Sequence, residues 1–381
     1  MMYTVSIRLD ENPEEARALF ALRMAYGDAC NRLVPIVQEK RLWNRVGLHQ
    51  CAYSLLREET PLGSQMVCNA IFSVCKAYKS QKALGKIKED SPVPKLCFAH
   101  RSIHYDKRTY TLKKDNKLSL NTLSGRITVP MKIGEPQHRI LESGTPKEAE
   151  LIFRNGKWLF NLVVELEDPI TLTSGLVMGV DVGENNLAAT STGKVLGGEN
   201  LRHERDKYLA TRRRLQSNGS QSAKQKLRQV SGKEQRRVKQ VNHETSKLIV
   251  EEAVKAGVSK IIMEDLTYIR SRIKGGVRIR TRLHRWAFRQ LQEFVEYKAK
   301  AKGIIVEYVN PAFTSQTCSC CGACGKRDKH RFFCKQCGLR AHADLNSSRN
   351  LARIGETAFF PRASVNPPDV EDVGCLVHVS L

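Results

Sequence analysis

Acidic residues are scarce in this chain of 381 residues, in which 39 Asp and Glu stand against 63 Lys and Arg. The formal net charge of +24 at pH 7 is too large for an ordinary neutral surface. Such an excess is typical of a protein that binds a polyanion, most often nucleic acid. A solubilising surface and an anionic membrane are the alternatives.

Long apolar runs are also missing, because no stretch approaches the roughly 20 residues that a membrane-spanning helix needs. The first residues, "MMYTVSIRLDENPEE", lack the basic segment and apolar core of a signal peptide. We therefore expect no membrane partner and a reducing, cytoplasmic location. There the twelve cysteines would be thiols or metal ligands, not disulfides.

The first third of the chain changes its hydrophobic period twice. Residues 3–9 alternate like a strand, residues 12–83 follow a helical period, and strand signals return over 93–167. Asn12-Pro13-Glu14-Glu15 is a helix start, and Asn155-Gly156 is a hairpin turn signal. The pattern predicts a small β-barrel split by a helical insertion, ending near Thr173.

Residues 175–190 then read as two strands joined by a bend. A helix from His243 to Gly257, the buried strand "SKIIMEDL", a further helix, the strand "KGIIVEYV" and a helix starting near Asp344 follow. This order predicts an α/β domain with a mixed sheet.

Three acids stand out in that domain. Asp181 follows an apolar strand, Glu264 ends "IIMED", and Asp344 heads "DLNSSRNLA". A strand-buried carboxylate must be paired or must bind a cation. Asp181 could cap a turn while Glu264 pairs with a basic residue. Alternatively, the acids could hold Mg²⁺, which takes oxygen ligands, and two such ions can activate water against a phosphodiester.

Six cysteines fall between Cys318 and Cys337. A Cys-x-x-Cys-Gly turn suits a tetrahedral, structural Zn²⁺ site, because its glycine can take positive φ. Cys334 and Cys337 form one such pair. For the other, both Cys318/Cys321 and Cys321/Cys324 fit. A redox pair is the alternative, but its βαβ context is missing.

Two segments are strongly basic. Residues 212–239 could form a solvated helix face or a disordered arm. Residues 270–289 begin six residues after Glu264, so we expect them to contact nucleic acid from a mobile loop near the acids. The candidate contacts there are Arg272, Lys274, Arg278, Arg280 and Arg282.

Several motifs together resemble the TnpB family of transposon-encoded, RNA-guided DNA endonucleases, which are related to compact type V CRISPR effectors. The motifs are "GVDVGENNLA", "IIMEDL" and "HADLNSSRNLA", with a Cys-x-x-Cys pair on each side of "KRDKHRFF". The resemblance is specific over 175–355 and architectural over 1–170. The chain departs from the family pattern at Asn346-Ser347-Ser348, where Asn-Ala-Ala is common, and at His342, where an acid is frequent.

The resemblance implies a RuvC-like nuclease domain of RNase H fold. Asp181, Glu264 and Asp344 would be its catalytic acids and would hold two Mg²⁺ ions. The family pattern also favours Cys318 and Cys321, which with Cys334 and Cys337 would bind one Zn²⁺.

The same resemblance implies the domain boundaries and the partners. We expect a β-barrel (wedge) domain over 1–11 and 91–172, a helical insertion over 12–90, the nuclease domain over 173–312 and 339–356, a zinc ribbon over 313–338 and a disordered tail over 357–381. A guide RNA and target DNA would be the partners of a monomer associated with the nucleoid of a prokaryote. The N-terminal domains would read a short flanking DNA motif. A compact type V effector and a guided repressor that does not cleave are the rival functions.

Overall fold

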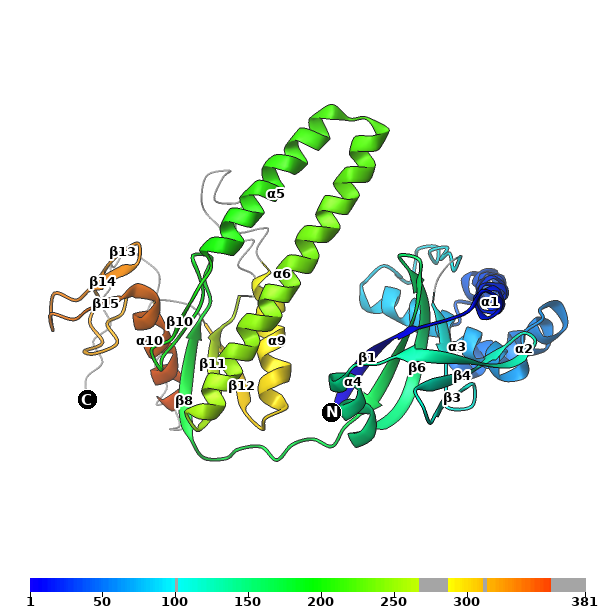
Figure 1. Cartoon of the computed structure of the whole chain (residues 1–381), viewed down its shortest axis with the longest axis horizontal. Coiled ribbons are helices and arrows are strands. Elements are labelled where there is room, and N and C mark those ends of the chain that lie inside the picture. Colours follow the sequence, from blue (N-terminus) through cyan, green and yellow to red (C-terminus); the bar gives the residue numbers. More distant parts are fainter. Residues whose placement is uncertain (100–101, 267–286, 311–313, 358–381) are drawn as a thin grey trace. The chain divides into compact units, whose positions relative to one another are not determined.

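The computed structural model describes residues 1–99, 102–266, 287–310 and 314–357. The chain forms two compact units, Met1–Asp168 and Pro169–Leu381 (Figure 1). In the described part of the chain, no helix has the length and apolar character needed to cross a membrane.

The N-terminal unit is built on a seven-stranded antiparallel sheet with the strand order β2-β6-β7-β1-β5-β4-β3. Its two edge strands, β2 and β3, follow each other in the chain across residues 106–109, so the sheet curves until it nearly closes. The predicted hairpin turn at Asn155-Gly156 joins β6 to β7 and is confirmed. The strands are β1 (Met2–Leu9), β2 (Ile103–Tyr105), β3 (Tyr110–Lys113), β4 (Lys117–Thr122), β5 (Gly125–Lys132), β6 (Thr145–Arg154) and β7 (Lys157–Glu165).

Three helices separate β1 from β2, and a fourth joins β5 to β6. The predicted helix start is confirmed: the Asn12 side chain accepts hydrogen bonds from the amides of Glu14 and Glu15. One hydrophobic core unites helices and sheet, with Leu33, Val74 and Phe160 fully buried in it. The helices are α1 (Pro13–Lys40), α2 (Arg45–Glu59), α3 (Ser64–Ala83) and α4 (Glu135–Ser143).

The C-terminal unit contains a five-stranded sheet with the order β10-β9-β8-β11-β12. The pairs β8/β11 and β11/β12 are parallel, whereas β8/β9 and β9/β10 are antiparallel. The predicted mixed sheet is therefore confirmed. The strands are β8 (Leu176–Asp181), β9 (Asn186–Thr190), β10 (Val195–Gly197), β11 (Val258–Glu264) and β12 (Ile305–Val309).

Helices cover both faces of this sheet. Alternate residues of β8 and β11, including Val180 and Met263, pack with α6 (Gln221–Lys255) and α9 (Phe288–Lys300). The intervening residues face α10 (Ala343–Thr357), which approaches so closely that a Cβ on Gly179 would lie 1.9 Å from the carbonyl oxygen of Ser348. Only glycine fits at this crossing.

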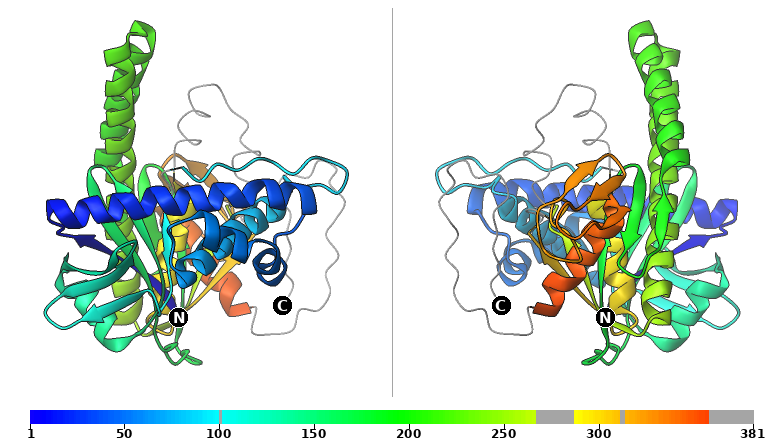
Figure 2. Two further views of the ribbon diagram at one scale, coloured as in Figure 1. Left: turned by 90° about the vertical axis from the view of Figure 1, so that its right-hand side faces the viewer. Right: turned by 90° about the vertical axis from the view of Figure 1, so that its left-hand side faces the viewer.

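α5 (Glu199–Asn218) and α6 form a long antiparallel hairpin that extends beyond the sheet (Figures 1 and 2). The basic segment 212–239 is thus helical apart from the turn, and Ser220 caps α6 through the amide of Ala223. The expectation of a helix start at His243 is wrong. Residues 221–242 contain good helix formers such as Gln, Lys and Arg, so they are helical. They show little apolar periodicity, and the hydrophobic pattern therefore does not predict this part of the helix.

Residues 314–342, here called the ribbon, contain a small three-stranded antiparallel sheet. Its strands are β13 (Lys326–Asp328), β14 (Arg331–Phe333) and β15 (Arg340–His342). Phe332 is buried against Cys318, Cys334 and Ala343, the first residue of α10. This contact joins the ribbon directly to the helix that follows it.

Candidate active site and metal centre

Asp181 and Glu264 end two neighbouring parallel strands. The register pairs Val180 with Met263, and each acid is the next residue of its strand. The two acids therefore lie next to each other at the same end of the sheet. Because strand side chains alternate, both acids lie on the face that α10 covers, opposite the face of Val180 and Met263. The strand ends therefore bring these two carboxylates together.

Asp344 lies in the first turn of α10 and is only 9% exposed. Two side chains hold its carboxylate. Asn186 of β9 donates to Oδ2 at 2.8 Å, and Arg327 of the ribbon donates to Oδ1 at 2.7 Å. The close packing of α10 on Gly179 carries Asp344 towards the ends of β8 and β11.

Asp181, Glu264 and Asp344 are here called the acid cluster, and the electrostatics show that the charges of Glu264 and Asp344 act on Asp181. Burial, followed by the charges of Glu264 and Asp344, raises the pKa of Asp181 to about 8. Burial also raises the pKa of Glu264, whereas a hydrogen bond donated by the Thr314 hydroxyl and the charge of Arg327 oppose that rise. Among the described residues, no Lys or Arg forms an ion pair with Glu264.

The acid cluster fits a divalent cation with oxygen ligands. Three carboxylates are the donor type that Mg²⁺ takes. Burial of Asp181 and the charges of Glu264 and Asp344 keep a proton on Asp181 near neutral pH, and a bound cation would offset both effects. An isolated turn cap or a simple ion pair would not produce this shift.

Arg327, like Asn186 and Thr314, is a residue of this site that the sequence did not predict. It belongs to β13, between the two cysteine pairs, and its guanidinium also donates to the carbonyl oxygen of Lys329 at 3.2 Å. Its charge lowers the pKa of both Asp181 and Glu264. In the sequence it is one of many basic residues, and only the folded ribbon distinguishes it.

The raised pKa of Asp181 predicts a pH-dependent effect of Asp181→Asn on stability. An unfolded Asp loses its proton near pH 3.9, while the folded one keeps it to about pH 8, so stability falls as pH rises across that window. Without Mg²⁺, we expect the variant to be more stable than the wild type by about 1–3 kcal/mol at pH 8, and by much less at pH 5.

Chemical denaturation in Mg²⁺-free buffer measures this difference. Asp265→Asn, on the exposed residue next to Glu264, is the matched control and should show no such trend. A destabilised Asp181→Asn protein at pH 8, or a difference that does not change with pH, would contradict the prediction.

Four cysteines of the ribbon converge on one point. The sulfur atoms of Cys318, Cys321, Cys334 and Cys337 lie within 4.8 Å of one another. Sγ of Cys318 lies 3.6 Å from that of Cys337, and Sγ of Cys321 lies 3.5 Å from that of Cys334. These separations are far longer than a disulfide bond of about 2.05 Å and close to the roughly 3.8 Å edge of a tetrahedron of sulfurs bound to zinc.

The turns after the cysteines decide between the two open alternatives for the first pair. Gly322 and Gly338 have φ of 78° and 73°, as a Cys-x-x-Cys-Gly turn requires, whereas Gly325 does not have positive φ. Backbone amides, led by that of Cys337, lower the pKa of the Cys334 thiol to about 7. The pKa values of the other three thiols are raised, so it is the convergence of the four sulfur atoms that fits a metal ion bound by thiolates.

The ribbon is fastened to α10 by amide side chains. Asn346 accepts from the amide of Ser319 at 2.8 Å and donates to the carbonyl oxygen of Thr317 at 2.7 Å. Asn350 donates to the carbonyl oxygens of Thr314 and Thr317. These bonds link the cysteine cluster rigidly to the helix that carries Asp344.

The predicted nucleic-acid contacts lie outside the described residues. They are Arg272, Lys274, Arg278, Arg280 and Arg282.

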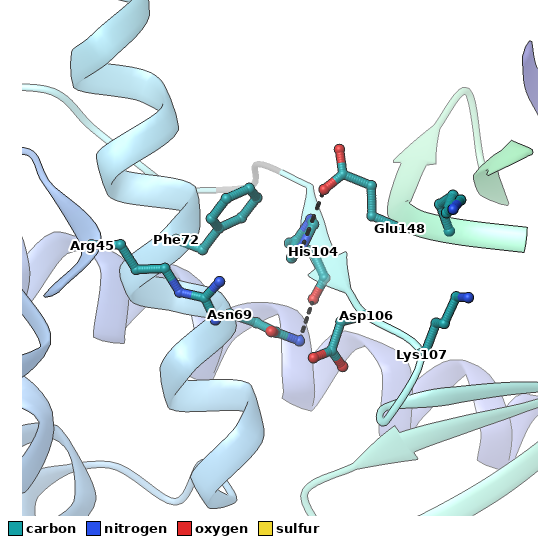
Figure 3. Close-up of a pocket in the computed structure, with 8 residues that line it drawn as sticks. Arg45, Asn69, Phe72, His104, Asp106, Lys107 and Glu148 are labelled. Atoms are coloured by element: carbon teal, nitrogen blue, oxygen red, sulfur yellow. Dashed lines mark hydrogen bonds and ion pairs between the residues drawn. The ribbon is translucent and has the colours of Figure 1, made fainter. Parts of the chain in front are cut away.

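A pocket of about 340 Å³ lies in the N-terminal unit where α2, α3 and β2 meet (Figure 3). The ring of Phe72 lies 4.6 Å from that of His104 and 5.6 Å from the Arg45 guanidinium. Asn69 donates to the carbonyl oxygen of His104 at 3.2 Å. The pocket is therefore lined by both positively and negatively charged side chains. The aromatic ring of Phe72 in it already contacts His104 and Arg45. The remaining lining residues are Asp106, Lys107, Lys147 and Glu148.

Comparison with protein families gives two matches. Residues 161–270 match a model described as "Probable transposase", and residues 288–351 match the "Cas12f1-like, TNB domain". A TnpB-like protein of Methanocaldococcus jannaschii is 32% identical over 247 residues, which cover 59% of this chain and 85% of that protein.

Two further proteins are similar over less of the sequence or only in fold. The CRISPR-associated endodeoxyribonuclease Cas12f1 of Sulfoacidibacillus thermotolerans is 34% identical over 219 residues, covering 52% of this chain and 50% of that protein. This chain thus spans about half the length of Cas12f1. A solved structure of CasPhi-2 (Cas12j) bound to crRNA has a TM-score of 0.52 and 10% identity, with 93% of this chain and 98% of that chain covered. That likeness shows a shared fold.

Proposed function

The chain belongs to the TnpB family, and on that premise we propose that it is an RNA-guided DNA endonuclease that hydrolyses phosphodiester bonds through a RuvC-type site. The acid cluster carries this proposal. Its members come from β8, β11 and α10, and the raised pKa of Asp181 beside Glu264 and Asp344 favours cation binding over a structural role.

Each residue of the site has a distinct part in the proposed reaction. Asp181, Glu264 and Asp344 would hold two Mg²⁺ ions, which would supply an activated water and stabilisation of the leaving oxygen. Arg327 would contact a phosphate oxygen of the strand, since guanidinium groups bind phosphate in a fixed geometry. Asn186 and Thr314 orient the carboxylates of Asp344 and Glu264 by hydrogen bonds.

The excess of positive charge supports a nucleic-acid complex as the working form. A net charge of +24 requires polyanionic partners on more than one surface, and the CasPhi-2 structure is described as bound to crRNA. We propose that a guide RNA selects the target by base pairing. The N-terminal unit would read a short flanking DNA motif, as in other guided nucleases.

We also propose that the four-cysteine cluster binds one structural Zn²⁺. A closed set of four thiolates leaves no open position for catalysis. Its proposed role is mechanical: it stabilises the ribbon, which presents Arg327 to Asp344 and is bonded to α10 through Asn346.

A compact type V CRISPR effector is the second candidate, and the match to Cas12f1 favours it. The two candidates share the proposed chemistry and differ in the source of the guide. A guided repressor that binds without cleaving is disfavoured because all three acids are present. Loss of any one of them would be expected in a chain that no longer cuts.

The test is to sequence the RNA that copurifies with the full chain and to reconstitute cleavage with it. The ribonucleoprotein should cut DNA that matches the guide beside one short flanking motif, and only when Mg²⁺ is present. A guide derived from a transposon end would support the TnpB assignment, and one derived from a repeat array would support a CRISPR effector. Failure to bind RNA, or guided binding with no cleavage at any flanking sequence, would overturn the proposal.

A further inference from the structure

Two histidines of the ribbon lie beside Asp344. One ring nitrogen of His330, one of His342 and one carboxylate oxygen of Asp344 all lie within 4.8 Å of one another. The two imidazole rings are stacked, with centroids 5.6 Å apart and planes inclined by 28°. Two nitrogen donors and one oxygen donor are therefore gathered around one point, apart from the four cysteines.

Backbone structure holds this arrangement. His330 lies in the turn between β13 and β14, where Lys329 takes a positive φ of 50°. Its carbonyl oxygen accepts a hydrogen bond of 2.8 Å from the amide of Ala343, at the start of α10. His342 ends β15, paired directly with Arg331. The two histidines are thus brought together by the main chain and not by a chance side-chain contact.

His342 carries an independent sign of a missing partner. Its Nδ1 atom is buried, and no hydrogen-bond donor or acceptor in the described part of the chain pairs with it. Buried polar atoms of proteins nearly always have a partner, so each exception needs an explanation. A cation bound at Nδ1 itself would provide one, because either ring nitrogen of a neutral imidazole can bind a metal.

We propose that His330, His342 and Asp344 form a binding site for a divalent transition-metal cation of the zinc class. Imidazole nitrogen with carboxylate oxygen suits Zn²⁺, Co²⁺ and similar ions, whereas Mg²⁺ takes oxygen ligands. Donors bound at about 2.1 Å in a tetrahedron lie roughly 3.4 Å apart. The three donors are already within 4.8 Å, so small side-chain rotations complete the site.

Occupation of this site acts on the acid cluster, because both contain Asp344. The carboxylate already accepts hydrogen bonds from Asn186 and Arg327, so a cation between the histidines competes with these contacts and draws Asp344 away from Asp181 and Glu264. Zinc-class ions would therefore inhibit the chain. The binding itself is independent of the proposed function, and only this consequence for cleavage rests on it.

The test uses the purified full chain, with the four-cysteine cluster loaded with Zn²⁺, in Mg²⁺-free buffer. Co²⁺ is added, and the visible absorption of Co²⁺ with nitrogen and oxygen donors is titrated. One ion per chain with the spectrum of nitrogen donors should bind, and His330→Ala and His342→Ala should each weaken it about 10-fold or more. His203→Ala removes an exposed imidazole of α5 and is the matched control, which should not change the affinity.

The outcomes separate this site from the proposed function. Absence of an ion with nitrogen donors, or equal weakening by His203→Ala, would overturn the proposal; since His330 is exposed on a turn, its loss should not prevent folding. If cleavage is also measured, excess Zn²⁺ should inhibit the wild type about 10-fold more than His330→Ala, each relative to its own rate without added zinc. Co²⁺ binding in a chain that cleaves nothing would support the metal site and count against the nuclease.

Discussion

Glu264→Gln and Asp344→Asn should each reduce the rate of guided DNA cleavage by about 10³-fold or more. Each substitution removes a negative charge from the acid cluster but keeps the size of the side chain. The proposed Mg²⁺ ions would then lose a ligand, and with it several kcal/mol of stabilisation of the transition state. Cleavage under single-turnover conditions, with saturating guide and target, measures the chemical step.

Binding must be measured on the same variants. We expect guide and target affinity to stay within about 3-fold of the wild type, because the cluster holds metal and the basic surfaces hold nucleic acid. Asp265→Asn removes an exposed carboxylate from the residue next to Glu264 and should leave cleavage unchanged. If this control loses as much activity as Glu264→Gln, or if Glu264→Gln still cleaves at the wild-type rate, the assignment of the cluster is wrong.

Cys334→Ser should remove the proposed zinc ion and destabilise the C-terminal unit by on the order of 4–5 kcal/mol or more. Cys334 is fully buried, and its sulfur lies 3.5 Å from that of Cys321. A structural zinc site contributes its binding free energy to folding, so the loss of one thiolate should destabilise the whole ribbon. Metal analysis and thermal unfolding measure the two effects.

The same substitution should also abolish cleavage, because the ribbon presents Arg327 to Asp344 and is bonded to α10. The matched control is Cys320→Ser. Cys320 is exposed, lies between Cys318 and Cys321 in the sequence and is not a member of the cluster. A Cys334→Ser protein that contains no zinc yet unfolds and cleaves like the wild type would end the structural-zinc proposal, whereas zinc loss in Cys320→Ser would mean that the ligand set is different.

Asp181 and Glu264 could be selected from the sequence because each follows an apolar strand, and a carboxylate at a buried strand end needs a partner. The hairpin at Asn155-Gly156 and the helix start at Asn12 depend on turn and capping chemistry within a few residues, and both are confirmed. The start of α6 was misjudged because charged helix formers show no apolar period, although they favour the helix equally well.

The first cysteine pair shows where local reasoning stopped. Two pairings satisfied the same spacing, and the residues alone left both open. The structure separates them by the positive φ of Gly322 and by the approach of Cys318 to Cys337. Arg327 had no signal at all, since its contact with Asp344 exists only once the ribbon is bonded to α10.

The sequence by itself determined the local properties of this protein: the strand and helix periods, the excess of positive charge, the Cys-x-x-Cys turns and the acids at the ends of strands. The tertiary structure alone decided which of these groups meet. Asp181, Glu264, Asp344, Arg327 and the ribbon histidines come from separate elements. Their contacts depend on the parallel pairing of β8 with β11 and on the packing of α10 against Gly179, and no short-range pattern encodes such long-range packing.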